Sequence, residues 1–341
     1  EKYMKENILI TGGLGYIGSH AVITLYDNGY RPVIIDNLSN SKPTSIENIK
    51  KIISYKPDFH HCDIRDKSRL KEIFNKYKFK AVFHFAGLKS VEESIKNPVE
   101  YFDNNVIGTK NLIEVMLYSK CEKLIFSSSA TVYGNPKYLP IDESHILNPI
   151  NPYGDNKKEI EDLCHKLTIE NPNFSCIALR YFNPIGAHPS GLIGEEPNGK
   201  PNNIMPIICN VASKINSKLY IYGDDYNTKD GTCIRDYIHV QDLVEGHIAA
   251  FKYLDTKKGY CAVNLGTGRG YSVKDLILNF EKNNKIKIQH EINGRRKGDA
   301  EEIYADASLA HRLFKWKVKK SIEDMVIHSW QWQRYRTKSI Q

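Results

Sequence analysis

The first half of the chain alternates short, continuously apolar runs with longer stretches of helical pattern. The apolar runs, each of strand length, lie at 8–10, 33–35, 81–85, 124–126 and 176–179, with a further one near residue 59. Helical patterns cover 17–28, which Gly29 ends, 108–118 and 153–169. Strands that are apolar throughout and separated by helices are typical of a parallel sheet covered on both faces. We therefore predict an α/β fold with a Rossmann-type, doubly wound parallel sheet.

The pattern changes after about residue 183. The stretch 184–203 is rich in proline and glycine, with polar residues between them, and is predicted to be loop. We therefore divide the chain into a larger N-terminal domain at 5–183 and a smaller C-terminal α/β lobe at 184–338. Strand-like runs near 219–222 and 261–265 are candidates to return to the main sheet, so the boundary need not be a single cut.

A glycine-rich segment lies between the first strand and the first helix. Gly12, Gly15 and Gly18 satisfy Gly-x-x-Gly-x-x-Gly, and residues 13–18 also satisfy Gly-x-Gly-x-x-Gly. Glycines allow a tight turn and a close approach of the backbone to a pyrophosphate, which the free N–H groups of the following helix attract. The position of this motif predicts a dinucleotide site, and the alternative is a plain strand-to-helix turn.

Two acidic residues follow the second and third strands. Asp36 ends the second strand, 18 positions after Gly18. A carboxylate there accepts hydrogen bonds from the adenosine ribose and repels a 2′-phosphate, so it favours NAD over NADP. The alternative is that Asp36 caps loop 37–41, which would lie beside the adenosine in either case. Asp63 could likewise bond the adenine amino group or stand in a solvated turn.

A second glycine cluster, at 266–270, also separates a strand from a helix. It comes late in the chain and lacks an acidic residue at the spacing of the first motif. We therefore interpret it as a turn rather than a second nucleotide site.

The spacing Tyr-x-x-x-Lys puts a phenol and an ammonium one turn apart on a helical face. It occurs at Tyr133/Lys137, Tyr153/Lys157 and Tyr253/Lys257. The first pair is interrupted by glycine and proline, and the third lies at the end of a helix. Only Tyr153 and Lys157 begin a good helix and follow a strand that ends in three serines, the last of them Ser129.

This pair suggests acid–base chemistry. Parallel sheets bind ligands beyond the carboxyl ends of their strands, which places Ser129 and the Tyr153 helix in the same cleft. A tyrosine that acts as a base near neutral pH needs its pKa lowered from ~10 to about 7, roughly 4 kcal/mol. Lys157 and an oxidised, positively charged nicotinamide could together supply that. The alternative is a surface Tyr–Lys pair.

Charge and cysteine usage exclude several other classes. The 48 Lys and Arg residues outnumber the 40 Asp and Glu residues without a long block of like charge, which disfavours a nucleic-acid partner and suits an anionic small molecule. The seven cysteines are scattered and never spaced as Cys-x-x-Cys, which favours a reducing, cytoplasmic compartment. His60, His61 and Cys62 lack a second pair at ligand spacing, so we expect no metal. No apolar run approaches the roughly 18 residues of a membrane span, so we expect no membrane partner.

Several segments together resemble one family. They are the glycine loop, Ser-Ser-Ser-Ala-Thr-Val-Tyr-Gly at 127–134, Pro-Tyr-x-x-x-Lys at 152–157, and stretches at 84–89, 101–106, 179–184, 186–191, 201–206, 230–240 and 295–299. They run from residue 7 to Trp332 and resemble the extended short-chain dehydrogenase/reductases, and within these the UDP-glucose (UDP-galactose) 4-epimerases.

The resemblance implies an isomerase of galactose metabolism that interconverts UDP-glucose and UDP-galactose with an NAD that stays bound. Tyr153 would take the proton of the sugar 4-hydroxyl while C4 gives hydride to NAD. The 4-keto sugar would turn over before hydride returns to its other face. Ser129 would hold the 4-oxygen, and Lys157 would lower the Tyr153 pKa and bond the nicotinamide ribose. The family forms homodimers through helices that lie here near 92–118 and 153–169.

The resemblance also assigns ligand contacts, NAD to 5–183 and the UDP-sugar mainly to 184–338. Besides Gly12, Gly15, Gly18 and the catalytic Ser129, Tyr153 and Lys157, the positions expected to contact NAD are Tyr16, Ile17, Asp36, Asn37, Leu38, Ser39, Asn40, Ser41, Asp63, Ile64, Phe85, Ala86, Gly87, Leu88, Lys89, Asn104 and Phe182. Besides Ser129 and Tyr153, those expected to contact the UDP-sugar are Lys89, Asn183, Asn203, Arg235, Tyr237, Arg296, Asp299 and Ile303. The arginines would meet the diphosphate bidentately; without the resemblance each would be taken as a surface residue.

Ile303 stands where the family sets its choice of sugar. That position, the fourth after the aspartate of Arg-Arg-x-Gly-Asp, lies near the sugar 2-substituent. A tyrosine there restricts the enzyme to glucose and galactose, and a small residue admits the N-acetyl forms. Isoleucine is smaller than tyrosine but stiff at χ1, so we expect UDP-N-acetylglucosamine to be at most a weak second substrate. The alternative is a core isoleucine beside Tyr304.

Two rival functions fit the sequence less well. A nucleotide-sugar 4,6-dehydratase shares the fold and cofactor but needs an added acid for water elimination, and the corresponding stretch here reads Ala130-Thr131-Val132. A non-catalytic NAD-binding regulator or scaffold would not need Ser129, Tyr153 and Lys157 together.

Overall fold

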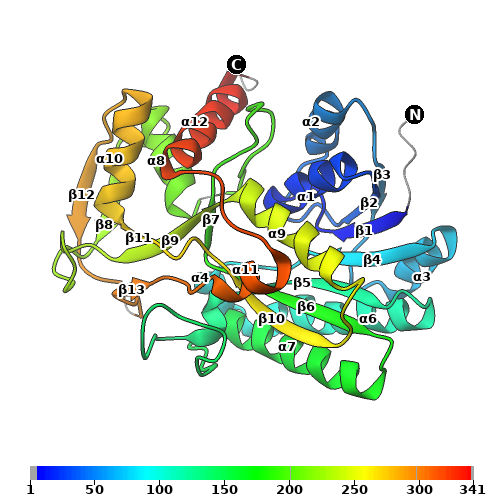
Figure 1. The fold of residues 1–341 in the computed structure, drawn as a ribbon. Helices are drawn as coiled ribbons and strands as arrows, with labels where there is room; N and C mark the ends of the chain where they lie inside the picture. The colour runs from blue at the N-terminus through cyan, green and yellow to red at the C-terminus, as the bar shows by residue number, and fades with distance from the viewer. Residues whose placement is uncertain (1–5, 200, 297, 339–341) are drawn as a thin grey trace.

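A sheet of seven parallel strands forms the centre of the computed structural model, which describes residues 6–199, 201–296 and 298–338 (Figure 1). The strands are β1 (Asn7–Thr11), β2 (Arg31–Asp36), β3 (Asp58–His61), β4 (Phe79–His84), β5 (Lys123–Ser129), β6 (Ser175–Tyr181) and β10 (Tyr260–Leu265). Their order is β10-β6-β5-β4-β1-β2-β3, so the chain builds outward from β1, then starts again beside β1 at β4 and builds the other way. This confirms the doubly wound α/β class. It puts the expected ligand site beyond the carboxyl ends of β1 and β4, where the order reverses.

Helices cover both faces of this sheet because its strands are apolar on both sides. On one face lie α1 (Tyr16–Asp27), α2 (Thr44–Ile53), α9 (Val240–Tyr253) and α11 (Ser308–Phe314) (Figure 1). On the other lie α3 (Lys67–Lys76), α6 (Gly108–Tyr118) and α7 (Pro152–Glu170). Two short helices, α4 (Val91–Lys96) and α5 (Pro98–Phe102), and a π-helical turn (Asp103–Ile107) precede α6. Along β1, Ile8 and Ile10 pack in the first core and Leu9 in the second, as the alternation of a strand requires.

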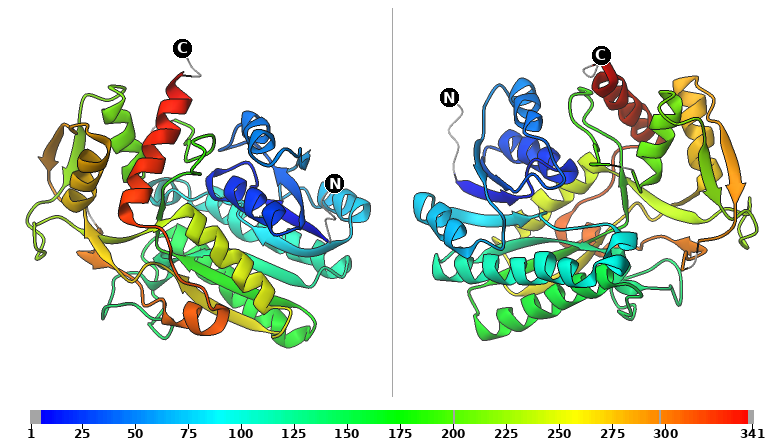
Figure 2. Two further views of the ribbon diagram at one scale, coloured as in Figure 1. Left: turned by 45° about the horizontal axis from the view of Figure 1, so that its top comes forward. Right: turned by 180° about the vertical axis from the view of Figure 1, so that it is seen from behind.

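The smaller lobe stands beside the main sheet and has its own core (Figure 2). Its strands are β7 (Asn183–Ile185), β8 (Leu219–Tyr222), β9 (Ile234–His239), β11 (Gly270–Ser272), β12 (His290–Asn293) and β13 (Glu302–Ile303). Its helices are α8 (Ile204–Ala212), α10 (Val273–Asn284) and α12 (Ile322–Lys338). Of the two strands considered as returning to the main sheet, β10 does so beside β6, whereas β8 pairs with β12 in a separate sheet.

The division at 183/184 stays a prediction. Residue 5, its first position, and Lys297 of the Arg-Arg-Lys-Gly-Asp motif lie outside the described residues. Among the described residues no helix combines the length and the apolar character that crossing a membrane requires.

Candidate active site

The loop after β1 is built around glycines. Gly12 has φ +65°, and a Cβ on it would lie 2.8 Å from the Ala86 nitrogen. A Cβ on Gly18 would lie 2.1 Å from the Gly12 carbonyl oxygen, closer than any side chain can sit. No side chain caps the N-terminus of α1, and its first turn carries no acidic residue. The free N–H groups and positive end of α1 therefore suit an anion such as a pyrophosphate.

Asp36 lies at the rim of this loop and is 7% exposed. Its carboxylate accepts hydrogen bonds from the backbone N–H groups of Leu14 (3.0 Å) and Leu38 (2.9 Å) and from the Ser41 hydroxyl (2.7 Å). Asp36 thus holds the loop that follows it, as the capping interpretation required. A carboxylate has roughly four acceptor positions, so one remains for a ribose hydroxyl.

Asp63 is more fully engaged. It accepts bonds from the backbone N–H and guanidinium of Arg65 and from the Asn37 side chain (2.9 Å), and Arg65 also pairs with Asp103. The hydrogen bonds from the Arg65 guanidinium hold the pKa of the Asp63 carboxyl well below its usual range. Its acceptor positions are therefore taken, and Asp63 fixes the side chain of Asn37 beside it.

Residues 85–89, which follow β4, lie beside the carboxyl end of β1, where the strand order of the sheet reverses. The Ala86 N–H donates to the Thr11 hydroxyl at 3.1 Å, which ties this segment to the end of β1. Asn105, in the π-helical turn, accepts from the Leu88 N–H and donates to its carbonyl. Its neighbour Asn104 donates to the Asn105 side chain at 2.9 Å. Most of the residues expected to contact NAD therefore meet at the carboxyl ends of β1, β2 and β4.

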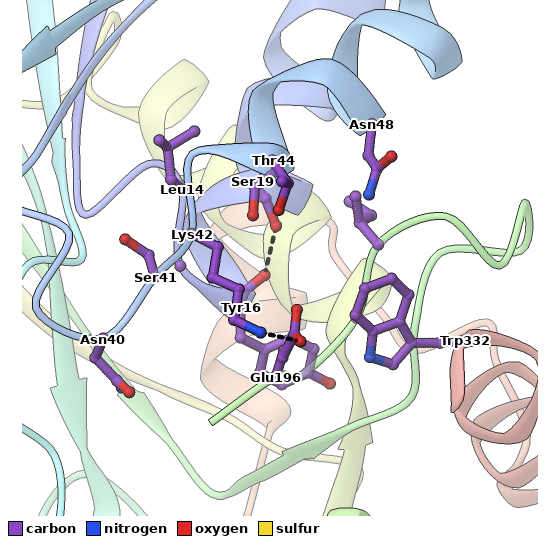
Figure 3. Close-up of a pocket in the computed structure, with 14 residues that line it drawn as sticks. Leu14, Tyr16, Ser19, Asn40, Ser41, Lys42, Thr44, Asn48, Glu196 and Trp332 are labelled. Atoms are coloured by element: carbon purple, nitrogen blue, oxygen red, sulfur yellow. Dashed lines mark hydrogen bonds and ion pairs between the residues drawn. The ribbon is translucent and has the colours of Figure 1, made fainter. Parts of the chain in front are cut away.

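A pocket beside this loop is shared between the two parts of the chain (Figure 3). Its lining comes from the start of α1, from 40–48, from 193–196 and from Trp332. Lys42 and Glu196 form an ion pair of 2.5 Å inside it. Just beyond, Asn198 donates to the Ser39 carbonyl at 3.0 Å. A segment of the smaller lobe thus folds over the loop assigned to the adenosine.

Ser129, Tyr153 and Lys157 meet at the carboxyl end of β5. Asn151 caps α7 by accepting from the Gly154 N–H at 2.9 Å, and Pro152 occupies the first helical position, so Tyr153 stands in the first turn. Lys157 is 5% exposed, and its Nζ donates to the Ser127 carbonyl at 2.6 Å and lies 5.6 Å from the centre of the Tyr153 ring. The surface-pair alternative is therefore wrong.

Burial dominates the electrostatics of these groups. It raises the pKa of Tyr153 to about 12, against the opposing effect of a hydrogen bond with Ser129. It lowers the pKa of Lys157 to about 8, against the opposing charge of Glu161. A cationic nicotinamide beside the phenol would favour the phenolate, as a base at this position requires.

The residues expected to hold the UDP-sugar lie on facing segments. Asn183 and Tyr237 are register partners in β7 and β9. Arg235 and Asp299 approach to 3.6 Å, and the Arg296 guanidinium lies 3.8 Å from the centre of the Tyr222 ring. Lys89 and Asn203 do not join this group; both donate to Glu195 (2.9 and 2.6 Å). Ile303 packs half-buried against Val132, Phe182 and their neighbours.

Comparison with known proteins agrees with this geometry. A family model described as GDP-mannose 4,6 dehydratase matches residues 9–328. A UDP-glucose 4-epimerase of Yersinia enterocolitica is 50% identical over 96% of this chain and 97% of its own length. UDP-glucose 4-epimerase 1 of Oryza sativa subsp. japonica is also 50% identical, over 96% of this chain and 94% of its own. The chain belongs to the UDP-glucose 4-epimerase family.

Solved structures of this epimerase family superpose closely. The UDP-glucose-4-epimerase of Stenotrophomonas maltophila, with bound NAD and formylated UDP-arabinopyranose, has a TM-score of 0.96 at 43% identity and covers 98% of this chain and 100% of its own. The enzyme of Bifidobacterium longum, in complex with NAD+ and UDP, has a TM-score of 0.94 at 43% identity and covers 97% and 99%.

The end of β5 is where the sequence analysis expected a dehydratase to carry an added acid. Here the 3₁₀ turn Ala130–Tyr133 follows Ser129, and none of its residues is acidic. Elimination of water would need an acid at this place, so the turn fits the epimerase relatives rather than the description of the family model.

The sequence analysis missed three acidic residues that make several hydrogen bonds at or near the site. Glu161 continues the spacing of Tyr153 and Lys157 by one more turn, a signal that was present but not used. Glu195 lies in a loop without periodicity. Asp236 is buried and accepts from the Thr267 N–H and hydroxyl and the Gly268 and Ala305 N–H groups. The second glycine cluster is thus a turn wrapped around a carboxylate, and that burial raises the pKa of Asp236.

Proposed function

We propose that this protein interconverts UDP-glucose and UDP-galactose in galactose metabolism, with NAD as a bound and recycled cofactor. The observation that carries the proposal is the meeting of Ser129, Tyr153 and Lys157 at the carboxyl end of β5, within the doubly wound sheet whose β1 loop suits a pyrophosphate. The close epimerase relatives and the NAD-bound structures of the same fold support it.

The NAD would lie across the switch point, with its pyrophosphate on the start of α1, its adenosine ribose at Asp36 and its nicotinamide near Lys157 and Phe182. When bound, NAD would supply a reversible acceptor for the hydride of the sugar C4. It is neither consumed nor replaced in one turnover, so no outside oxidant or reductant is needed.

The protein's own groups then manage the proton and the sugar. Tyr153, as phenolate, takes the proton of the 4-hydroxyl, and Ser129 donates a hydrogen bond to the 4-oxygen. Lys157 stabilises the phenolate by its charge and holds the nicotinamide ribose. After the 4-keto sugar turns over, Tyr153 returns the proton to the 4-oxygen as the other face of C4 is reduced.

The smaller lobe would hold the nucleotide while the sugar turns. Arg235 and Arg296 would meet the diphosphate, with Asn183, Asn203, Tyr237 and Asp299 around the remainder. Lys89 and Asn203 would exchange their bonds with Glu195 for bonds with the ligand. Ile303 would stand beside the sugar 2-substituent and disfavour the N-acetyl sugars.

We further propose a homodimer in a reducing, cytoplasmic compartment. The helices assigned to the dimer contact carry exposed apolar side chains: Ile95 (62% exposed), Val99 (81%), Tyr118 (78%) and Ile169 (70%). Exposed apolar side chains on neighbouring helices support a protein–protein contact there. All seven cysteines are free thiols, which supports the compartment.

The test is conversion of UDP-galactose to UDP-glucose by the purified protein without added reductant. We expect equilibration of the two sugars and release of NAD, not NADP, when the protein is denatured. A Tyr153→Phe control keeps the ring and removes the phenol, so kcat should fall on the order of 10²–10⁴ with UDP-sugar binding largely kept. Loss of water from the product, or an inactive wild-type protein that holds NAD, would refute the epimerase assignment.

A further inference from the structure

Glu161 lies one helical turn beyond Lys157, on the face of α7 that already carries Tyr153. The three side chains stand at i, i+4 and i+8, so they line up along one side of the helix. Glu161 is only 2% exposed, like Lys157 and unlike the other acidic residues of α7 that pair at the surface, Glu159, Asp162 and Glu170.

Strand β5 lies beneath this face of α7, and its last three residues are all serines that contact successive turns of the helix. Ser127 offers its carbonyl to Lys157 at 2.6 Å, and Ser128 donates its hydroxyl to Glu161 Oε1 at 2.5 Å. Ser129 is hydrogen-bonded to the phenol one turn earlier. Three consecutive serines at the end of β5 therefore contact three successive turns of α7 and fix how the helix lies along the strand. Glu161 makes the contact that lies farthest along α7 from Tyr153.

The Glu161 carboxylate is fixed by three neighbouring strands. Besides Ser128 on β5, Arg180 on β6 donates from Nε to Oε1 at 3.0 Å and from Nη2 to Oε2 at 2.6 Å. Tyr260 on β10 donates to Oε2 at 3.0 Å. Ser128 and Arg180 are register partners, so one pair of facing residues holds both carboxylate oxygens. A buried carboxylate that accepts four hydrogen bonds, two of them from a guanidinium, is held in a fixed position.

The surroundings of Lys157 leave Glu161 as its anionic neighbour among the described residues. On β4, His84 is fully buried between Thr11 and Thr109, and burial lowers its pKa to about 3, so it is neutral. Arg180 is cationic and forms an ion pair with Glu161. Glu143 also interacts with the Arg180 charge, whereas Glu161 is the anion that acts on Lys157. Without Glu161 the ammonium of Lys157 would be buried near Arg180 and would lose that anion.

We propose that Glu161 is a positioning residue for the epimerase reaction: held by Ser128, Arg180 and Tyr260, its carboxylate keeps buried Lys157 an ammonium ion and fixes the turn of α7 that presents Tyr153. The inference rests on the proposed function, because it assigns Glu161 a part in the same proton transfer. Glu161 does not touch substrate; it acts through Lys157.

The test compares Glu161→Gln with the wild type in the pH dependence of kcat/KM for UDP-galactose. The amide removes the negative charge, so Lys157 loses its proton more readily and stabilises the phenolate less. Tyr153 then deprotonates at higher pH, so the rising, low-pH side of the kcat/KM profile should move up by about one pH unit. On that side of the profile kcat/KM should be about tenfold lower than in the wild type, and it should recover at higher pH. Glu161→Asp keeps the negative charge but has a side chain one methylene shorter, which moves the charge away from Lys157. The low-pH side of its kcat/KM profile should lie between those of the wild type and Glu161→Gln. The matched control, Glu170→Gln on the exposed end of α7, should titrate as the wild type.

A second readout needs no turnover. The absorbance of tyrosinate in NAD-loaded protein, taken as the difference from Tyr153→Phe, should show the same upward shift. If Glu161→Gln does not fold, the Asp variant carries the test. A Gln or Asp variant that is thermally weakened but titrates as the wild type overturns the proposal, because a merely structural role predicts that result. An inactive wild type refutes the proposed function instead, and the absorbance titration still tests Glu161.

Discussion

At the residue scale, Ile303 stands on β13 as the register partner of Arg235 and packs half-buried beside Val132 and Phe182. Both interpretations offered by the sequence therefore describe part of its surroundings. One side of the side chain belongs to a small apolar cluster, and the position as a whole borders residues expected to hold NAD and UDP-sugar. A β-branched side chain anchored on one side cannot swing away from a bulky sugar substituent.

Ile303→Ala should therefore relax the choice of sugar. A steric difference of one or two methylenes is worth ~1–3 kcal/mol, so the wild type should prefer UDP-glucose to UDP-N-acetylglucosamine by about 10- to 200-fold in kcat/KM. The alanine variant should narrow that ratio, and it should lose about 2 kcal/mol of stability or less because the residue is only half-buried. Ile292→Ala, on β12 of the separate sheet, is the matched control. Equal kcat/KM values for both sugars in the wild type would show that Ile303 is no gate.

At the element scale, the turn from β1 into α1 depends on backbone contacts that no side chain can share. A Cβ on Gly18 would meet the Gly12 carbonyl oxygen at 2.1 Å, and backbone atoms cannot move aside as a flexible side chain can. Gly18→Ala should therefore displace the loop and lower the amount of NAD that co-purifies with the protein. Gly294→Ala is the control, because a Cβ there meets nothing within 4 Å. Full NAD content in Gly18→Ala, measured after denaturation, would contradict this account of the loop.

The elements that could be predicted are those whose burial shows in the sequence. The helix predicted over 108–118 and the apolar runs of the main sheet appear at or within three residues of their predicted bounds, because each carries a long period or a continuous apolar run. β7, β11 and β13, of two or three residues each, carry no period and were missed. The return of β10 but not β8 to the main sheet depends on pairing with partners far along the chain, which no local pattern encodes.

The residues of the candidate site divide in the same way, into those that a local sequence pattern reveals and those that only the folded chain brings together. Ser129, Tyr153 and Lys157 were found because strand end, helix start and spacing coincide in one short stretch. Glu195 was missed because its role arises from bringing Lys89 and Asn203 together across a loop. Asp63 was assigned by position, yet its acceptor positions are filled by Arg65 and Asn37, which only the folded loop reveals.

At the scale of the whole molecule, hydrogen bonds and an ion pair hold the two parts of the chain together at more than one place. The Lys42–Glu196 pair and the Asn198–Ser39 bond fasten the smaller lobe over the adenosine loop. Elsewhere, the Ile141 N–H donates to the Tyr304 carbonyl and joins the lobe to the loop that precedes α7. A cofactor enclosed this way should leave slowly, which suits a reaction that returns NAD to its starting state in every cycle.

The proposed dimer can be tested separately from catalysis, because Ser129, Tyr153 and Lys157 all come from one chain. Val99 is 81% exposed on α5, among the helices proposed to form the contact. Val99→Asp would bury an unpaired carboxylate there, at a cost of several kcal/mol, and should give a monomer at micromolar concentration in analytical ultracentrifugation. The monomer should keep epimerase activity but unfold at a lower temperature, since the apolar side chains it exposes lose their cover. Ile292→Asp, a similar change on β12, should leave the dimer intact. A Val99→Asp protein that sediments as the wild type would place the contact elsewhere on the surface.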